Sequence, residues 1–395
     1  NFLKVLIMKK AFYMMAAAAI ALSSCSSEET TDVAKSSAIS FRTSVGLNSR
    51  GAETTTENLE SMWVTGYNLT DDVTYFSGVQ FDKEKVAPGA VAGFLPESAW
   101  YWQAGKRYKF VAISPAIDKW HGTLDIQKDN VSFKNVVIPE NISDQKDLVI
   151  GSNTAKADDH MNGTASQLTL QHVLSQLQFK VHNGNKRITY HIAGLRVVHA
   201  ADKGSYSFDT SSKVGKWDEN ATTGEQTYEL KFTQPIMLNG TDGHTHAFLT
   251  PENHGAMIVP QVVTPWDGAV QKDDVTYNNG TYIALLVNVR YTNGAYIYPA
   301  KSEGEEYYGW VAVPVPTVKG SATANWEMGK KYIYTLNLSE GCGKVDPVKP
   351  NPDGGGVVTP GDKDPLPGDN IFGKPIKFTV EVSTWADGST TDIQM

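Results

Sequence analysis

Short runs of β-branched and aromatic residues, separated by glycine, proline, aspartate and asparagine, dominate this sequence and limit the folds open to it. Such runs are typical of strands, and their regular spacing is typical of an all-β sandwich. A 3.6-residue apolar period, which would indicate amphipathic helices, is hard to find. In the N-terminal half we expect strands at residues 39–41, 62–67, 73–81, 108–113, 131–138 and 148–150.

The clearest strand pattern of the C-terminal half lies in residues 168–181. Leu177, Phe179 and Val181 alternate there with polar residues, as in a strand with one buried face. Further strands are expected at residues 188–192, 195–199, 228–232, 256–263, 281–291, 310–315 and 332–338. The chain is long enough for two hydrophobic cores, so we expect two domains, residues 38–165 and residues 166–340.

The start of the chain has the features of an exported lipoprotein. Two lysines and a short apolar run form a secretory signal over residues 1–24, and the run is too short to span a membrane as a helix. Leu22-Ser23-Ser24-Cys25 resembles the bacterial lipobox, whose cysteine thiol receives a diacylglyceryl group before cleavage. Cys25 would then be the lipidated first residue. The alternative is a plain signal peptide with an incidental cysteine.

Charge and cysteine content restrict the partners of the exported chain. Removing residues 1–24 deletes three lysines and no acidic residue, so the formal charge falls from −8 to −11, which argues against binding to nucleic acid. Residues 25–37 are mostly polar and are expected to form a lipidated tether. The sequence contains no second apolar segment of spanning length. With Cys25 acylated, Cys342 has no partner for a disulfide.

A polar, glycine-containing stretch at residues 48–56 follows the first expected strand. Exposed loops of this kind are where proteases cut most easily. Arg50, followed by Gly51, is the one basic residue between Arg42 and Lys83, so an arginine-specific protease would find a single site there. The alternative is an ordinary solvated surface arginine.

The C-terminus carries a strand on a long tether. Residues 341–370 contain seven glycines and six prolines, a composition that favours a partly extended linker. In the segment that follows, residues 371–395, Ile376, Phe378, Val380 and Val382 fall on one face of a strand and polar residues fall on the other. This strand is either the last strand of the second domain or a strand that can be donated to another subunit.

Several of these stretches together resemble the Bacteroidales fimbrillin family, the lipoprotein subunits of type V pili. The resemblance rests on the export segment, on residues 41–56 with Arg50, on residues 168–181 around His172-Val173-Leu174-Ser175, and on the closing stretch at residues 326–334. It covers nearly the whole mature chain. It implies two transthyretin-like β-sandwich domains in tandem, a lipidated N-terminal tether and a C-terminal donor-type strand.

The resemblance also implies a function. Precursors of this family reach the cell surface as outer membrane lipoproteins, and an arginine-specific protease removes the first strand, which corresponds here to a cut between Arg50 and Gly51. A strand of another subunit then fills the groove that is left, so the partners are other pilin subunits in a fimbrium that supports adhesion to a host or bacterial surface. The donor residues here would be Ile376, Phe378, Val380 and Val382.

Enzyme functions find little support in the sequence. It contains no glycine-rich phosphate loop, no Gly-x-Ser-x-Gly elbow and no His-Glu-x-x-His, so we expect no catalytic residue, metal or cofactor. His172 has no carboxylate or second histidine at ligand spacing, which favours a structural role. The alternative function is a monomeric surface lipoprotein that binds glycans through some of its nine tryptophans, although most of these rings are expected in the cores.

Overall fold

The computed structural model describes residues 37–45, 58–85, 93–115, 121–240, 246–250, 255–268, 280–300, 307–317, 321–352, 364–384 and 390–393. Within these residues the fold is all-β, as the sequence predicts. Their helical structure is confined to the short turns η2 (Ile142–Asp144), η3 (Ala157–Asp159) and η4 (Glu219–Ala221). Residues 37–395 group into one compact unit, so two tandem transthyretin-like domains stay a prediction.

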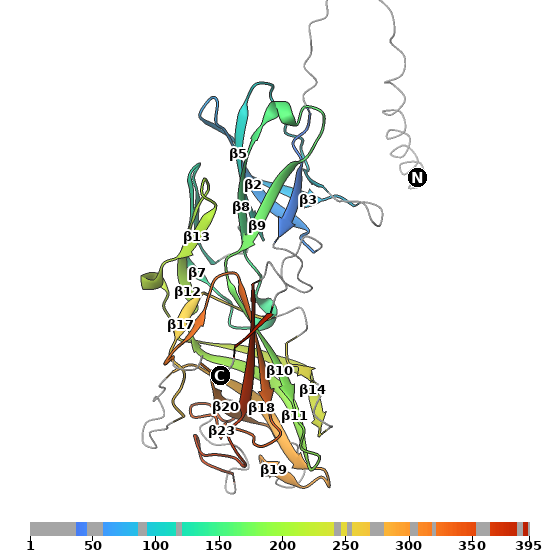
Figure 1. The fold of residues 1–395 in the computed structure, drawn as a ribbon, viewed down its shortest axis with the longest axis vertical. Coiled ribbons are helices and arrows are strands. Elements are labelled where there is room, and N and C mark those ends of the chain that lie inside the picture. Colours follow the sequence, from blue (N-terminus) through green and yellow to red (C-terminus); the bar gives the residue numbers. More distant parts are fainter. Residues whose placement is uncertain are drawn as a thin grey trace, which may run out of the picture. The chain divides into compact units, whose positions relative to one another are not determined.

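The first set of strands closes into a barrel in the order β1-β4-β3-β2-β5-β8-β9. Figure 1 labels β2, β3, β5, β8 and β9 of this barrel. The bounds are β1 (Phe41–Val45), β2 (Ser61–Asn68), β3 (Val73–Lys83), β4 (Phe94–Pro96), β5 (Arg107–Ser114), β8 (Val149–Lys156) and β9 (Ser166–His172). Strand β9 closes the barrel between β8 and β1, although the sequence pattern assigned it to the second domain. Because residues 37–395 form one compact unit, a domain boundary between residues 165 and 166 stays a prediction.

Two larger sheets follow. One has the order β15-β10-β22-β24-β25, with β16 beside β10, and the other has the order β14-β11-β18-β20-β23, with β19 beside β18. The first comprises β10 (Ser175–His182), β15 (Ala247–Phe248), β16 (Ala256–Ile258), β22 (Lys330–Asn337), β24 (Lys377–Thr384) and β25 (Thr390–Ile393). The second comprises β11 (Ile188–Ala200), β14 (Gln226–Asn239), β18 (Tyr282–Tyr291), β19 (Tyr296–Tyr298), β20 (Gly309–Pro314) and β23 (Lys344–Val345). One apolar core contains side chains of both sheets, as in a sandwich.

The two strands expected at residues 188–192 and 195–199 are a single strand, β11. Its pairing with β14 and with β18 shifts register between Ile192 and Gly194 on both sides, which marks a β-bulge. A bulge interrupts the alternation of side chains without ending the strand. The alternation of apolar and polar residues is therefore interrupted near Ala193, although the strand continues through it.

A third sheet joins the two halves of the chain. It has the order β13-β12-β7-β6, and β7 of the N-terminal half pairs antiparallel with β12 of the C-terminal half. Its strands are β6 (His121–Ile126), β7 (Asn130–Val137), β12 (Lys203–Asp209) and β13 (Val214–Trp217), and a separate pair is formed by β17 (Gln261–Val263) and β21 (Ala324–Trp326). Much of this sheet was missed because its strands are short and rich in glycine, serine and charged residues.

Strand β5 shows why the two halves share a core. Tyr108 and Phe110 lie in the barrel core, whereas Val111 and Ile113 point the other way and lie in the core of the larger sheets. Alternate side chains of a strand point to opposite faces, so a strand buried on both faces binds two layers together. The nearly continuous apolar run of β5 in the sequence is the signal for this position.

The described flanks of the glycine- and proline-rich segment pack against the second large sheet. Cys342 and Val345 are fully buried, and β23 pairs with β20. The backbone N–H of Val345 also donates to the carbonyl of Asp369, which joins the two flanks. Composition favoured an extended linker here, but Cys342 and Val345 at its described start are buried instead.

Asp346 lies in this packed segment and makes stability depend on pH. Its Oδ1 accepts hydrogen bonds from Tyr282 Oη at 3.1 Å and from the N–H groups of Val348 and Lys349. Burial nevertheless raises the pKa of the Asp346 carboxyl above its ordinary value. A carboxyl whose pKa is raised by folding contributes stability that is present below the ordinary aspartate pKa and is lost as pH rises through the folded pKa.

We therefore expect Asp346→Asn to gain stability relative to the parent protein as pH rises from about 4 to about 7. Urea unfolding of both proteins at the two pH values measures this. Asp209→Asn is the matched control, because hydrogen bonds from Ser212 and Ser211 lower the pKa of the exposed Asp209 carboxyl, and the sign of its pH effect is the reverse. A difference between Asp346→Asn and the parent that stays constant with pH contradicts the prediction.

Candidate functional site

The predicted site residues divide into two groups. Cys25, Arg50 and Gly51 lie outside the described residues, so lipidation and processing there stay predictions. The four predicted donor residues are described, and they lie together at β24: Ile376 directly before it, and Phe378, Val380 and Val382 within it.

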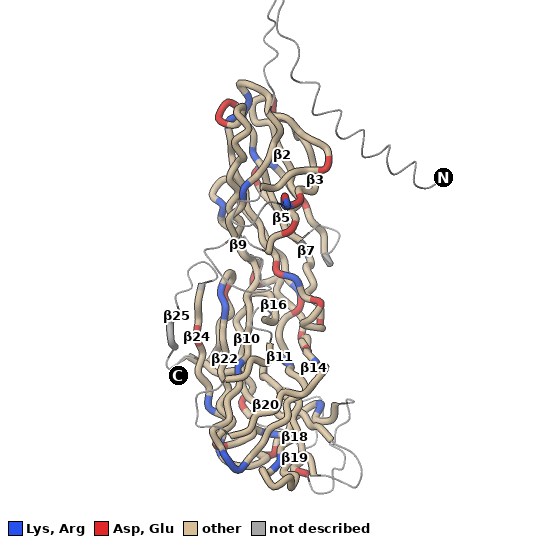
Figure 2. Tube along the Cα trace, turned by 90° about the vertical axis from the view of Figure 1, so that its right-hand side faces the viewer, with Lys and Arg blue, Asp and Glu red and all other residues tan. Residues whose placement is uncertain are grey.

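Strand β24 lies inside the first large sheet and pairs in cis. It runs antiparallel to β22 from Lys377 opposite Asn337 to Thr384 opposite Lys330, and β25 pairs along its other side. Figure 2 shows β24, β22 and β10 side by side. The strand is therefore paired along its full length with β22, and from Val380 to Ser383 with β25, within its own chain.

The four donor residues differ in how well their own chain buries them. Ile376 and Val380 are each 7% exposed, whereas Phe378 and Val382 are only partly buried against the edge of the core. The intervening Lys377 and Thr379 are exposed. The apolar face of β24 thus packs on the sandwich but is not fully covered by it.

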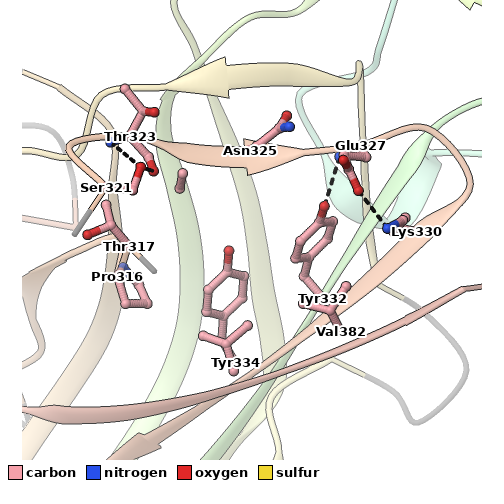
Figure 3. A pocket seen from close by; sticks show the side chains of 12 residues that line it. Pro316, Thr317, Ser321, Thr323, Asn325, Glu327, Lys330, Tyr332, Tyr334 and Val382 are labelled. Carbon is pink, nitrogen blue, oxygen red and sulfur yellow. Dashed lines mark hydrogen bonds and ion pairs between the residues drawn. The ribbon is translucent and has the colours of Figure 1, made fainter. Parts of the chain in front are cut away.

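A pocket of about 290 Å³ lies next to this face, between β21 and the β22–β24 pair. Figure 3 shows Tyr332, Tyr334 and Val382 on its floor, with β21 passing above them. Val380 also lines it. Removing β24 would take away two lining side chains and leave the pocket open to solvent along the edge of β22.

The two tyrosines of the pocket are held by hydrogen bonds from the residues around β21. Trp326 Nε1 donates to Tyr334 Oη at 2.8 Å, and the backbone N–H of Glu327 donates to Tyr332 Oη at 2.9 Å. Burial raises the pKa of Tyr332 to about 12 and also raises the pKa of Tyr334. Both rings are therefore neutral at physiological pH and serve as an apolar floor for the valines of β24.

A clasp holds the start of β24 in place; we define it as Glu340, Gly341, Gly373, Lys374 and Lys377. Gly341 and Gly373 form an antiparallel bridge, and the backbone N–H of Lys374 donates to the carbonyl of Glu340 at 2.9 Å. The Glu340 carboxylate lies 3.3 Å from Lys377 Nζ and 3.6 Å from Lys374 Nζ. The Lys377 hydrogen bond and the two lysine charges lower the pKa of Glu340.

Sequence patterns do not reveal the clasp, because its two halves lie more than thirty residues apart in the chain. Its glycines permit an approach that a side chain would block. A methyl group on Gly341 would lie 1.7 Å from the carbonyl oxygen of Lys374, and Gly373 has a φ of +71°. Gly341 and Gly373, which flank the glycine-rich middle of the segment, were the one sequence signal for a close approach of two backbones.

Strand β1 is the second part of the site. It pairs parallel with β9 from Phe41 opposite Ser166 to Val45 opposite Leu170, and Phe41 also pairs with Phe94 of β4. Phe41 is 0% exposed, and its ring makes edge-to-face contacts at 5.0 Å with the rings of Phe81 and Phe110. β1 therefore fills a groove in the barrel wall between β4 and β9.

His172 has a structural role in the fold. His172 Nδ1 lies 2.7 Å from Asp147 Oδ2 in a buried pair, which fits the structural role expected for it. The partner carboxylate is distant in sequence, so spacing could not reveal it. Among the described residues, no three His, Cys, Asp or Glu side chains are grouped to hold a metal ion. Of the described helical segments, none is long and apolar enough to cross a membrane.

The tryptophans are mostly core residues. Trp102, Trp266, Trp310 and Trp326 are fully buried. The other described tryptophans are half-buried: Trp63, Trp100 and Trp217. No tryptophan among the described residues presents a freely exposed ring for stacking on a sugar, whereas Trp120 and Trp385 lie outside them. A glycan site built on exposed tryptophans thus has no support in this part of the chain.

Comparisons with known proteins gave one family match and several matches to solved structures. A family model described as fimbrillin-like matches residues 49–355. The chain is similar to the crystal structure of a candidate cell adhesion protein from Bacteroides uniformis, with 12% identity, a TM-score of 0.43 and coverage of 90% of this chain and 100% of that one. It is also similar to a fimbrial assembly protein from Parabacteroides distasonis, with 11% identity, a TM-score of 0.35 and coverage of 90% and 98%. No curated protein matches the sequence significantly.

Proposed function

The chain belongs to the fimbrillin-like family, and from this membership we propose that it is a pilin that polymerises by strand exchange on the cell surface. Membership of the family supports a pilus subunit that assembles with other pilin subunits. The finer parts of the proposal are the lipid on Cys25, the outer membrane location before processing, the cut at Arg50 and the donation of β24. The proposal assigns the chain no catalytic role and no cofactor.

The observation that carries the exchange mechanism is the burial of β1. This strand ends at Val45, shortly before Arg50, so a cut after Arg50 separates it from the rest of the chain. Its departure would expose the rings of Phe81 and Phe110 and leave one edge of β9 without a backbone partner. An apolar groove beside an unpaired strand edge is a template for an incoming strand.

Strand β24 is suited to fill such a groove. Its apolar residues alternate with polar ones, and Phe378 and Val382 are only partly buried in its own subunit. Residues 338–376 connect β22 to β24, which gives the strand a long tether once its clasp opens. The cis pairing with β22 is then the state of the unassembled subunit.

The lipid has a temporary role in this proposal. Cys25 holds the precursor at the outer membrane, and the cut at Arg50 removes the lipid together with β1. The N-terminal residue of the protein taken from cells tests this step. Acylated Cys25 indicates an intact lipoprotein or an anchor subunit, whereas Gly51 indicates a processed subunit.

We expect brief treatment with an arginine-specific protease to convert the monomer into a ladder of polymers on gels run under mild denaturation. Arg50→Ala is the matched control and should remain monomeric under the same treatment, because β1 then stays covalently attached. Mass spectrometry of the cleaved material should show a chain beginning at Gly51.

Two results would count against the pilin. One is a protein cleaved at Arg50 that stays monomeric at high concentration. The other is a stable monomer whose mobility shifts only when polysaccharide is added, which would favour the glycan-binding alternative.

A further inference from the structure

The apolar residues of β1 and β24 follow the same pattern. In and before β1 the inward-facing residues are Ile39, Phe41, Thr43 and Val45. At β24 the apolar face carries Ile376, Phe378, Val380 and Val382. Three of the four positions are identical at identical spacing, and the fourth exchanges threonine for valine.

Resting on the function proposed above, we propose that β24 of a second copy of this chain enters the β1 groove in a single register. Ile376 takes the place of Ile39, and Val382 takes the place of Val45. The incoming strand runs parallel to β9, as β1 does. Because the replacement of Thr43 by Val380 removes a polar group from the groove, β24 is the better occupant.

The hydroxyl of Thr43 is a defect in the packing of β1. Thr43 is 9% exposed, and its Oγ1 is buried without a hydrogen-bond partner among the described residues. Its register partner on β9 is Leu168, which offers only an apolar side chain. A buried hydroxyl without a partner destabilises the state that contains it, whereas valine has nearly the same shape and no polar atom.

Differences in burial also favour the replacement of β1 by β24. Phe41 and Val45 are 0% and 3% exposed in the groove, whereas Phe378 and Val382 are only partly buried beside β22. Moving β24 into the groove therefore removes more of its phenylalanine and valine surface from water than its own subunit does. The gain in burial at these two side chains favours the β1 groove over the edge of β22.

Other registers fit worse. A shift of one residue turns Lys377, Thr379 and Glu381 toward the core. A shift of two residues toward the C-terminal end of the groove places Lys374 where Ile39 is now fully buried. The opposite shift places Val380 in the space of the Phe41 ring and leaves a cavity.

Disulfide cross-linking measures the register of the donated β24 against β9. In the proposed register Glu381 takes the place of Ser44, whose partner on β9 is the exposed Thr169. We mix cleaved Thr169→Cys protein with cleaved Glu381→Cys protein under mild oxidation and expect a linked dimer. Gln167→Cys mixed with Glu381→Cys is the matched control, because Gln167 lies two residues along the same exposed face of β9 and reports the shifted register. Cys342 is fully buried, and the cut removes Cys25.

Peptides of residues 374–384 test the effect of the unpaired Thr43 hydroxyl. The peptide with the parent sequence should bind the cleaved protein about tenfold more tightly than the same peptide with Val380→Thr, since an unpaired buried hydroxyl has an effect of about this size. Conversely, Thr43→Val in the full chain should slow the release of β1 after cleavage by about tenfold.

The outcomes separate this inference from the function on which it rests. Polymers that link through Gln167→Cys, or not at all through Thr169→Cys, overturn the register and leave strand exchange standing. Equal binding of the two peptides overturns the role of Thr43. Failure of both the polymers and the peptides to occupy the groove overturns the proposed function and this inference together.

Discussion

Phe41→Ala is expected to lower the free energy of unfolding of the uncut protein by about 3–5 kcal/mol, which is the usual range for a fully buried phenylalanine. The ring is 0% exposed and lies edge-on to Phe81 and Phe110, so its removal leaves a cavity lined by aromatic side chains. The barrel cannot collapse around that cavity easily, because β1 is held between β4 and β9. Urea or thermal unfolding measures the loss.

Two controls define what the Phe41 result means. Arg42→Ala changes the exposed neighbour on the same strand and should alter stability by less than about 0.5 kcal/mol. Phe378→Ala in the uncut monomer should destabilise less than Phe41→Ala, since Phe378 is only partly buried there. Equal losses for Phe41→Ala and Arg42→Ala would show that β1 is not anchored by the groove. Assembly after cleavage would then have no apolar site to refill.

Gly341→Ala is expected to open the clasp and release β24 from β22. The added methyl group would lie 1.7 Å from the carbonyl oxygen of Lys374, and a backbone atom cannot move aside as a flexible side chain can. Overpacking of this kind costs about 1–3 kcal/mol, which corresponds to roughly 5- to 150-fold faster hydrogen exchange of the β24 amides. After cleavage at Arg50, the variant should also polymerise faster, because its donor strand is already free.

Gly294→Ala is the control that separates clasp opening from general destabilisation. Gly294 lies in the turn between β18 and β19, its φ is +90°, and a methyl group there meets no atom within 4 Å. The substitution strains the backbone by about 1–2 kcal/mol but leaves β24 untouched. Unchanged exchange of the β24 amides in Gly341→Ala, or an equal rise in Gly294→Ala, would refute the clasp.

The clasp also bears on where assembly is controlled. Glu340 binds both Lys374 and Lys377 at the start of the donor strand, and these charged groups lie at the surface. In the proposed mechanism, a cut at Arg50 lets β1 leave the groove, but the donor strand must still leave its own sheet. Assembly by strand exchange therefore needs two openings, one in each partner, and the second is local to residues 340–377.

Much of the fold could be predicted from alternation along the chain. The apolar positions of residues 177–181 and 332–338 identify β10 and β22, and the four apolar residues of β24 lie on one face as their spacing requires. Alternation identifies a strand and its buried face because neighbouring side chains point to opposite sides of the backbone. It fails where a bulge interrupts it, as in β11, and where a strand is short and polar, as in β13.

Sequence by itself determined the all-β class and the apolar face of β24. Tertiary structure alone decided which strands pair, that β24 lies in cis beside β22, that Gly341 meets Gly373, and that Thr43 is buried without a hydrogen-bond partner. The physical reason is that a strand's pattern specifies which face is buried but not which edge it joins. Partners distant in sequence are selected by the packing of the whole core.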